Sequence, residues 1–67
     1  MMNLKSALEN LSSMPLPELE DLDWLIRKEW QDTIDNYCLN LGWTLTEVTQ
    51  YLEAAELEYK FRKETLT

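Results

Sequence analysis

Residues 44–64, TLTEVTQYLEAAELEYKFRKE, decide the fold, because this stretch is typical of one helix with two apolar stripes on nearly opposite faces. The second stripe holds Ala54, Leu57 and Phe61, with Tyr51 at the edge between the two stripes. A chain of 67 residues can bury only one stripe against itself, so we expect the second to contact another protein. At about 100° per residue, the first stripe gathers the residues that can pack inside the chain: Leu45, Val48, Leu52, Ala55 and Tyr59.

The residues just before this helix give the most specific local signals in the chain. Thr44 and Glu47 have the spacing of a capping box, and Trp43 and Val48 are placed as a hydrophobic staple. Gly42 supplies the left-handed residue that commonly ends a helix. A connection this short predicts that the helices before and after it pack together as an antiparallel hairpin.

The first arm of the hairpin is predicted to be one continuous helix over about residues 17–41. Pro17 suits its first turn, where a missing N–H costs nothing, and neither glycine nor proline follows before Gly42. The predicted inner stripe of this helix is Leu19, Leu22, Ile26, Trp30, Ile34, Tyr37 and Leu41. Its acidic first turns would lie near the basic last turns of the helix over 44–64, which carry Lys60, Arg62 and Lys63.

A short helix over about residues 3–12 comes first, with Asn3 at the N-cap position. Its apolar residues at helical spacing are Leu4, Ala7, Leu8 and Leu11. Pro15 and Pro17 separate it from the hairpin, because proline disfavours helix in the residue before it. The predicted architecture is all-α: a single small domain over residues 1–67, in which a short N-terminal helix folds across an antiparallel hairpin (about 17–41 and 44–64).

The chain is strongly acidic, with 13 Asp and Glu against six Lys and Arg and a net charge of −7. This charge opposes direct binding to nucleic-acid phosphates or to anionic membrane surfaces. It favours solubility, and it would also speed association with a basic or apolar groove whose rim is positive. The predicted acidic docking surface is Glu18, Glu20, Asp21 and Asp23.

The residues that catalysis or metal binding would need are missing. There is no histidine, and Cys38 is the single cysteine, so the chain offers neither an internal disulfide nor a tetrahedral zinc set. We expect no enzymatic activity, no cofactor and no metal site, because there is also no glycine-rich phosphate loop. The lone cysteine, the lack of a signal peptide and the lack of an apolar run of roughly 20 residues favour a soluble cytoplasmic protein.

Trp24 lies among polar neighbours, off the predicted inner stripe, so it either anchors a partner or packs beneath the first helix or against the Pro15–Pro17 segment. Leu57 and Phe61 either contact a partner or a second copy of the chain, or are covered by the first helix, or lie in a frayed C-terminal turn. The predicted partner-binding residues are Trp24, Tyr51, Ala54, Leu57 and Phe61.

The leading functional hypothesis is a small acidic interaction module, an adaptor, assembly factor or inhibitor, that docks on a larger protein through apolar helix faces. One alternative is an acidic inhibitor of the kind some phages encode, which mimics nucleic acid and occupies a basic cleft of a nucleic-acid-binding protein. Another is a homodimer, in which two hairpins form a four-helix bundle.

Overall fold

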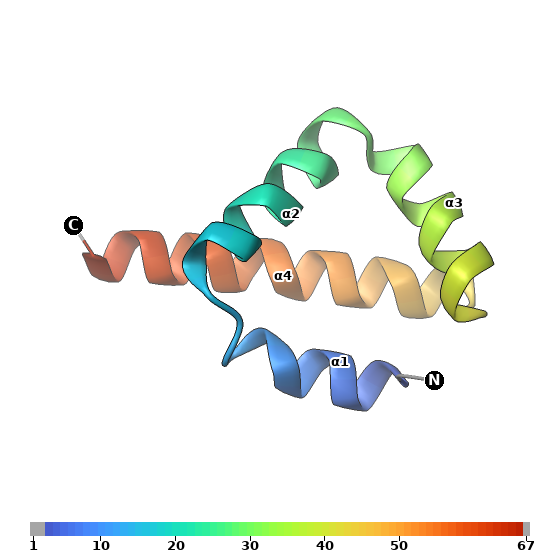
Figure 1. Ribbon diagram of the computed structural model, residues 1–67, viewed down its shortest axis with the longest axis horizontal. Coiled ribbons are helices and arrows are strands. Elements are labelled where there is room, and N and C mark those ends of the chain that lie inside the picture. Colours follow the sequence, from blue (N-terminus) through green and yellow to red (C-terminus); the bar gives the residue numbers. More distant parts are fainter. Residues whose placement is uncertain (1–2, 67) are drawn as a thin grey trace.

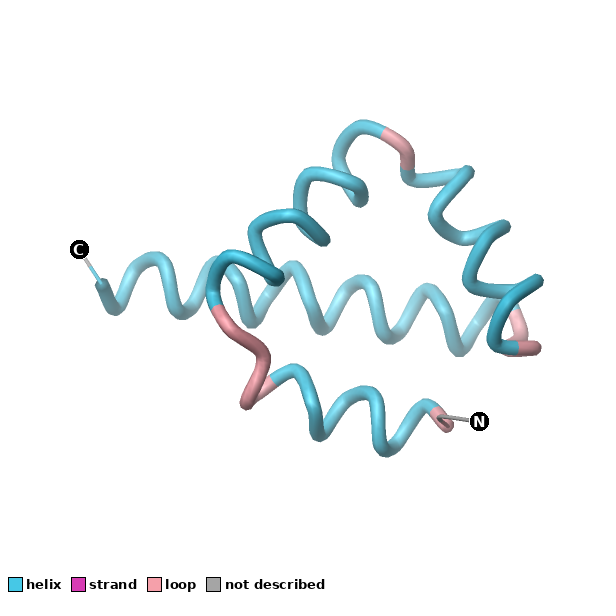
Figure 2. Tube along the Cα trace, in the orientation of Figure 1, coloured by secondary structure: helices cyan, strands magenta, loops and turns pink. Residues whose placement is uncertain are grey.

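Four helices make up the part of the chain that the computed structural model describes, residues 3–66 (Figure 1). They are α1 (Leu4–Leu11), α2 (Leu16–Lys28), α3 (Trp30–Leu41) and α4 (Leu45–Leu66). Short loops and turns join them, and no strand occurs between residues 3 and 66 (Figure 2). The predicted all-α class is confirmed.

The arrangement is a bent hairpin with one extra helix. In Figure 1, α2 and α3 form two sides of a triangle whose base is α4, and α1 lies along α4 on the side away from the apex. The chain therefore leaves along α2 and α3 and returns along α4, as the hairpin prediction requires. Both α1 and α2 pack against α4, which makes α4 the central element of the fold.

The helix ends follow the predicted local signals. The Thr44 backbone N–H donates to Glu47 Oε1 at 3.1 Å, and the Glu47 N–H donates to Thr44 Oγ1 at 3.2 Å, which completes the capping box. Gly42 has φ 70° and ends α3, with its N–H donating to the Cys38 carbonyl at 3.1 Å. Asn3 caps α1 by accepting from the Ser6 N–H at 2.8 Å.

The prediction of one continuous helix over about residues 17–41 is wrong. The helix begins at Leu16 and breaks at Glu29, whose φ of −133° and ψ of 42° lie outside the helical region. Neither proline nor glycine causes this break. At the bend the Leu25 carbonyl still accepts from the Glu29 backbone N–H at 2.8 Å, and the buried Thr33 hydroxyl donates to the same carbonyl at 3.4 Å. The Thr33 side chain therefore links the two helices across the bend.

The bend changes which residues of the predicted inner stripe are buried. Both arms reach the core, since Leu19, Leu22 and Ile26 of α2 and Ile34 of α3 are all buried. Trp30, by contrast, is 36% exposed, because it opens α3 at the bend and no longer follows the helical phase of α2. Its predicted place in the inner stripe is therefore wrong.

The inner face of α4 is also rotated from the predicted one. Val48, Leu52, Ala55 and Tyr59 are buried as predicted, but Leu45 is 61% exposed. Tyr51 is buried instead, because the rings of Tyr37 from α3 and of Trp43 lie 5.7 and 5.5 Å from its ring. The buried face of α4 is therefore shifted toward Tyr51, on the side of Tyr37 and Trp43, and away from Leu45.

One apolar core joins all four helices. Its buried members come from every helix and from the turn before α4: Ala7, Leu11, Leu19, Leu22, Ile26, Ile34, Trp43, Val48, Tyr51, Leu52, Ala55 and Tyr59. Trp43 and Val48, the predicted staple pair, both belong to it. Leu19, Leu52 and Val48 are the largest side chains that are fully buried, so the contact of α2 with α4 forms its centre.

Candidate interaction surface

The outer face of α4 carries two large apolar side chains that the fold leaves uncovered. Leu57 and Phe61 are each 68% exposed. They lie four residues apart, so they are neighbours one turn apart on the helix surface. Neither belongs to the core that unites the four helices, and α1, which packs on α4, does not cover them. The pair forms the centre of a candidate docking surface, which we call the outer patch.

A shallow apolar hollow adjoins the outer patch. It is lined by Leu16, Phe61, Arg62 and Thr65 and has a volume of about 180 Å³. Small-molecule sites usually have volumes of about 300–1,000 Å³, so this hollow is too small for such a ligand. It could accept one apolar side chain of a partner beside the Phe61 ring, which is the geometry in which interface anchors are usually found.

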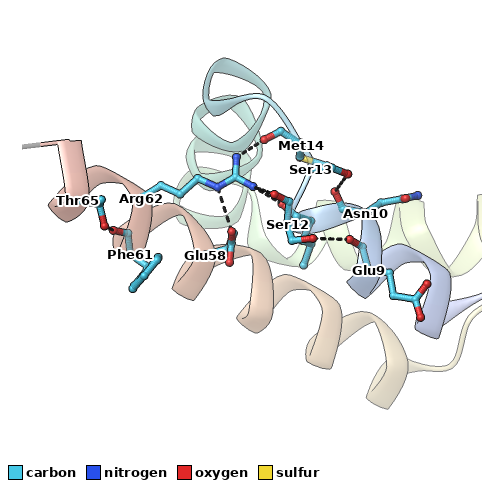
Figure 3. A network of polar contacts seen from close by, with 10 residues as sticks. Glu9, Asn10, Ser12, Ser13, Met14, Glu58, Phe61, Arg62 and Thr65 are labelled. Carbon is cyan, nitrogen blue, oxygen red and sulfur yellow. Dashed lines mark hydrogen bonds and ion pairs between the residues drawn. The ribbon is translucent and has the colours of Figure 1, made fainter.

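Arg62 fixes the position of α1 beside this surface (Figure 3). Its guanidinium donates to the carbonyl oxygens of Leu11, at 2.8 Å, and of Ser12 and Met14. Its Nε also pairs with Glu58 Oε1 at 3.0 Å. The last carbonyls of a helix have no partner within it and carry partial negative charge, so one cation satisfies the C-terminal end of α1.

The sequence did not indicate this role of Arg62. The cations of α4 were expected near the acidic start of α2, and Lys63 does share a hollow there with Glu20 and Asp23. Lys63 also lies over the Tyr59 ring, 5.7 Å from its centroid, within the range of a cation–π contact. The carbonyl groups that Arg62 binds lie 48 to 51 residues away in the chain, beyond the reach of any local pattern.

Two of the predicted partner-binding residues on α4 belong wholly or partly to the monomer. Tyr51 is buried, with 7% of its surface exposed, and it packs in an aromatic cluster with Tyr37 and Trp43 at centroid distances of 5.7 and 5.5 Å. Its predicted exposure to a partner is therefore wrong, because Tyr37 of α3 and Trp43 cover its ring. Ala54 is half-buried and packs against the core.

Trp24 is 55% exposed on α2. It lines a hollow that contains three of the chain's six cations, Arg27, Lys28 and Lys63. The other residues that line this hollow are Glu20, Asp23 and Tyr59. Phe61 borders a different hollow, so the structure does not bring Trp24 and the outer patch into one site. The residues that share this hollow with Trp24 include none from α1 and none from residues 15–17, so the two predicted packing alternatives find no support.

The predicted acidic docking surface loses one member. Glu18, Glu20 and Asp21 are exposed, but Asp23 is 7% exposed and its Oδ2 pairs with Arg27 Nε at 3.0 Å. The other carboxylate oxygen, Oδ1, is buried and finds no hydrogen-bond partner among the described residues. Asp23 faces the core because α2 packs on α4 through the neighbouring residues Leu22 and Ile26.

No protein family, no curated protein and no solved structure matches this chain. Within residues 3–66, no helix combines the length and the apolar character that crossing a bilayer requires. The same residues contain no group of three or more His, Cys, Asp or Glu side chains that could hold a metal ion. Cys38 is a half-buried free thiol on α3.

Proposed function

We propose that this protein is a small acidic interaction module, an adaptor, assembly factor or inhibitor, that docks the outer patch of α4 onto an apolar groove of a larger protein. One observation carries the proposal: Leu57 and Phe61 are each 68% exposed, although the core is complete without them. Single exposed apolar residues are ordinary, whereas an adjacent pair beside a hollow is typical of an interface.

Charge supports a particular kind of groove. The chain has a net charge of −7, so a second copy of it would be repelled at long range, while a groove with a basic rim would attract it. Within the proposal, the negative surface speeds the encounter and the apolar pair provides the anchor that slows dissociation. The free thiol of Cys38 suits a reducing compartment such as the cytoplasm.

The test compares two double variants. Leu57→Ser with Phe61→Ser removes the outer patch, and Leu39→Ser with Leu45→Ser removes two equally apolar side chains that are 82% and 61% exposed elsewhere. We expect the first variant to lose binding to the native partner by at least about 1–2 kcal/mol, the scale of lost interface anchors. The second should bind as the wild type does, and both should keep wild-type helical content.

Binding is measured by capture from the native cell with tagged full-length protein, and sedimentation of the same samples reports self-association. If both variants lose binding equally, nonspecific hydrophobic association explains the capture, and the outer patch has no special role. If the outer-patch variant binds normally, the proposal is wrong. A wild-type dimer that only the outer-patch variant dissociates would instead identify a second copy as the occupant.

A further inference from the structure

A second hollow lies between α2, α3 and α4, away from the outer patch. It is lined by residues from three helices and from the turn after α1: Met14, Glu18, Asp21, Leu22, Leu25, Tyr37 and Tyr51. Its volume is about 240 Å³, below the range of about 300–1,000 Å³ found for small-molecule sites. A cavity of this size suits one side chain of a partner better than a free metabolite. We call it the tyrosine hollow.

Two neutral phenols face the tyrosine hollow. The rings of Tyr37 and Tyr51 lie 5.7 Å apart, so the two phenols are close neighbours. Burial, followed by the charge and hydrogen bond of Tyr37, raises the pKa of Tyr51 to about 12. Burial also raises the pKa of Tyr37. Both side chains therefore stay uncharged at neutral pH, where they offer ring surfaces and hydroxyl oxygens to a cation.

The charges at the hollow are all of one sign. Glu18 and Asp21 lie three residues apart on α2, so their exposed carboxylates are neighbours on one side of the helix. No Lys or Arg lines the tyrosine hollow, and no ion pair to either carboxylate is found among the described residues. The hollow beside Trp24 differs, because Arg27, Lys28 and Lys63 already balance its acids.

We propose that the tyrosine hollow receives a Lys or Arg side chain of the partner, with the cation between the two carboxylates and the aliphatic stem against Leu22, Leu25 and the Tyr37 ring. This inference rests on the proposed function and names the chemistry of the partner's second contact. Long cationic side chains bury their aliphatic stems on apolar surface while the charged head stays in a polar environment. The tyrosine hollow offers both, because leucine side chains and carboxylates line it together. The Tyr37 and Tyr51 rings, which line the same hollow, would add a favourable cation–π interaction.

The experiment uses a blocked peptide, Gly-Gly-Arg-Gly-Gly, its Lys analogue, and the neutral Gln peptide as a control. Each is titrated into the full chain while the ring signals of the three tyrosines are followed by NMR. We expect the basic peptides to move the Tyr37 and Tyr51 signals in a saturable way. The Tyr59 signals should stay in place, because Tyr59 lies at the other hollow. The Gln peptide should move none of them.

Two variants separate a specific site from general attraction to an acidic protein. Glu18→Gln with Asp21→Asn should weaken the peptides at least about fivefold, because two exposed ion pairs are lost. Asp32→Asn with Glu53→Gln removes the same charge at exposed positions elsewhere and should leave the affinity within about twofold of wild type. All four side chains are exposed, so the folds are expected to survive.

Equal weakening by the two variants would overturn the inference, and so would ring shifts of Tyr59 that match those of Tyr37. Shifts produced by the Gln peptide would overturn it as well. The titration uses no native partner, so its failure would leave the docking of the outer patch untouched. Conversely, loss of the outer-patch proposal would not change the expected peptide binding.

Discussion

Replacement of Leu52 by alanine is expected to destabilise the domain by about 2–5 kcal/mol, the range for a leucine removed from a well-packed core. Leu52 is fully buried on the face of α4 that packs against α2, so its truncation would leave a cavity in the core. Stabilities of whole domains are only about 5–15 kcal/mol, and a 67-residue chain lies at the low end. Leu52→Ala should therefore unfold much of the protein at room temperature.

Urea denaturation followed by circular dichroism measures this effect, and Leu57→Ala is its matched control. Both changes make the same substitution in the same helix, but Leu57 is 68% exposed, so its loss should cost less than about 0.5 kcal/mol. A small effect at Leu52 would contradict the assignment of the inner face of α4. A large effect at Leu57 would show that the outer patch serves folding.

The second large effect concerns Arg62. Arg62→Met keeps the aliphatic stem and removes the guanidinium that binds three carbonyls of residues 11–14 and the Glu58 carboxylate. Hydrogen bonds to a charged group contribute about 1.5–3 kcal/mol, and the half-buried position lowers this figure. We expect a loss of about 2 kcal/mol, concentrated in α1, whose buried side chains are only Ala7 and Leu11.

Hydrogen exchange locates this loss, because undocking of α1 should expose its amides while those of α2 and α4 stay protected. Lys60→Met is the control: Lys60 makes only a surface pair with Glu56 at 3.2 Å, for which we expect about 0–0.5 kcal/mol. Unchanged exchange in α1 of the Arg62 variant would mean that Ala7 and Leu11 alone hold the helix.

Much of the fold follows from short-range chemistry, which is why it could be predicted from the sequence. The cap of α1 at Asn3, the stop at Gly42 and the box of Thr44 with Glu47 each depend on residues within one turn. The inner face of α4 followed from helical periodicity, which placed Val48 and Leu52 in the core.

The departures arise where tertiary contacts override local preference. At the break at Glu29, the Thr33 side chain donates to the Leu25 carbonyl eight residues earlier, and neither proline nor glycine stands at this point of the sequence. The burial of Tyr51 depends on the Tyr37 ring of α3, and the position of α1 depends on Arg62, which binds carbonyls about 50 residues away in the chain. Periodicity within one helix contains no information about either contact.

The candidate site divides in the same way. The exposure of Leu57, Phe61 and Trp24 could be predicted, because each lies off the apolar stripe of its own helix. The tyrosine hollow could not, since Tyr37 and Tyr51 come from different helices and meet Glu18 only after the bend brings α2 and α3 together.

The outer patch is tested most directly by photocrosslinking within the native cell. A benzophenone amino acid replaces Phe61, which is 68% exposed, so the change should not disturb the core, and a second protein carries it at Leu39, which is 82% exposed. We expect position 61 to give one discrete heavier adduct that Leu57→Ser abolishes, and position 39 to give none. The same adducts from both positions, or none from position 61 in a folded protein, would contradict the account.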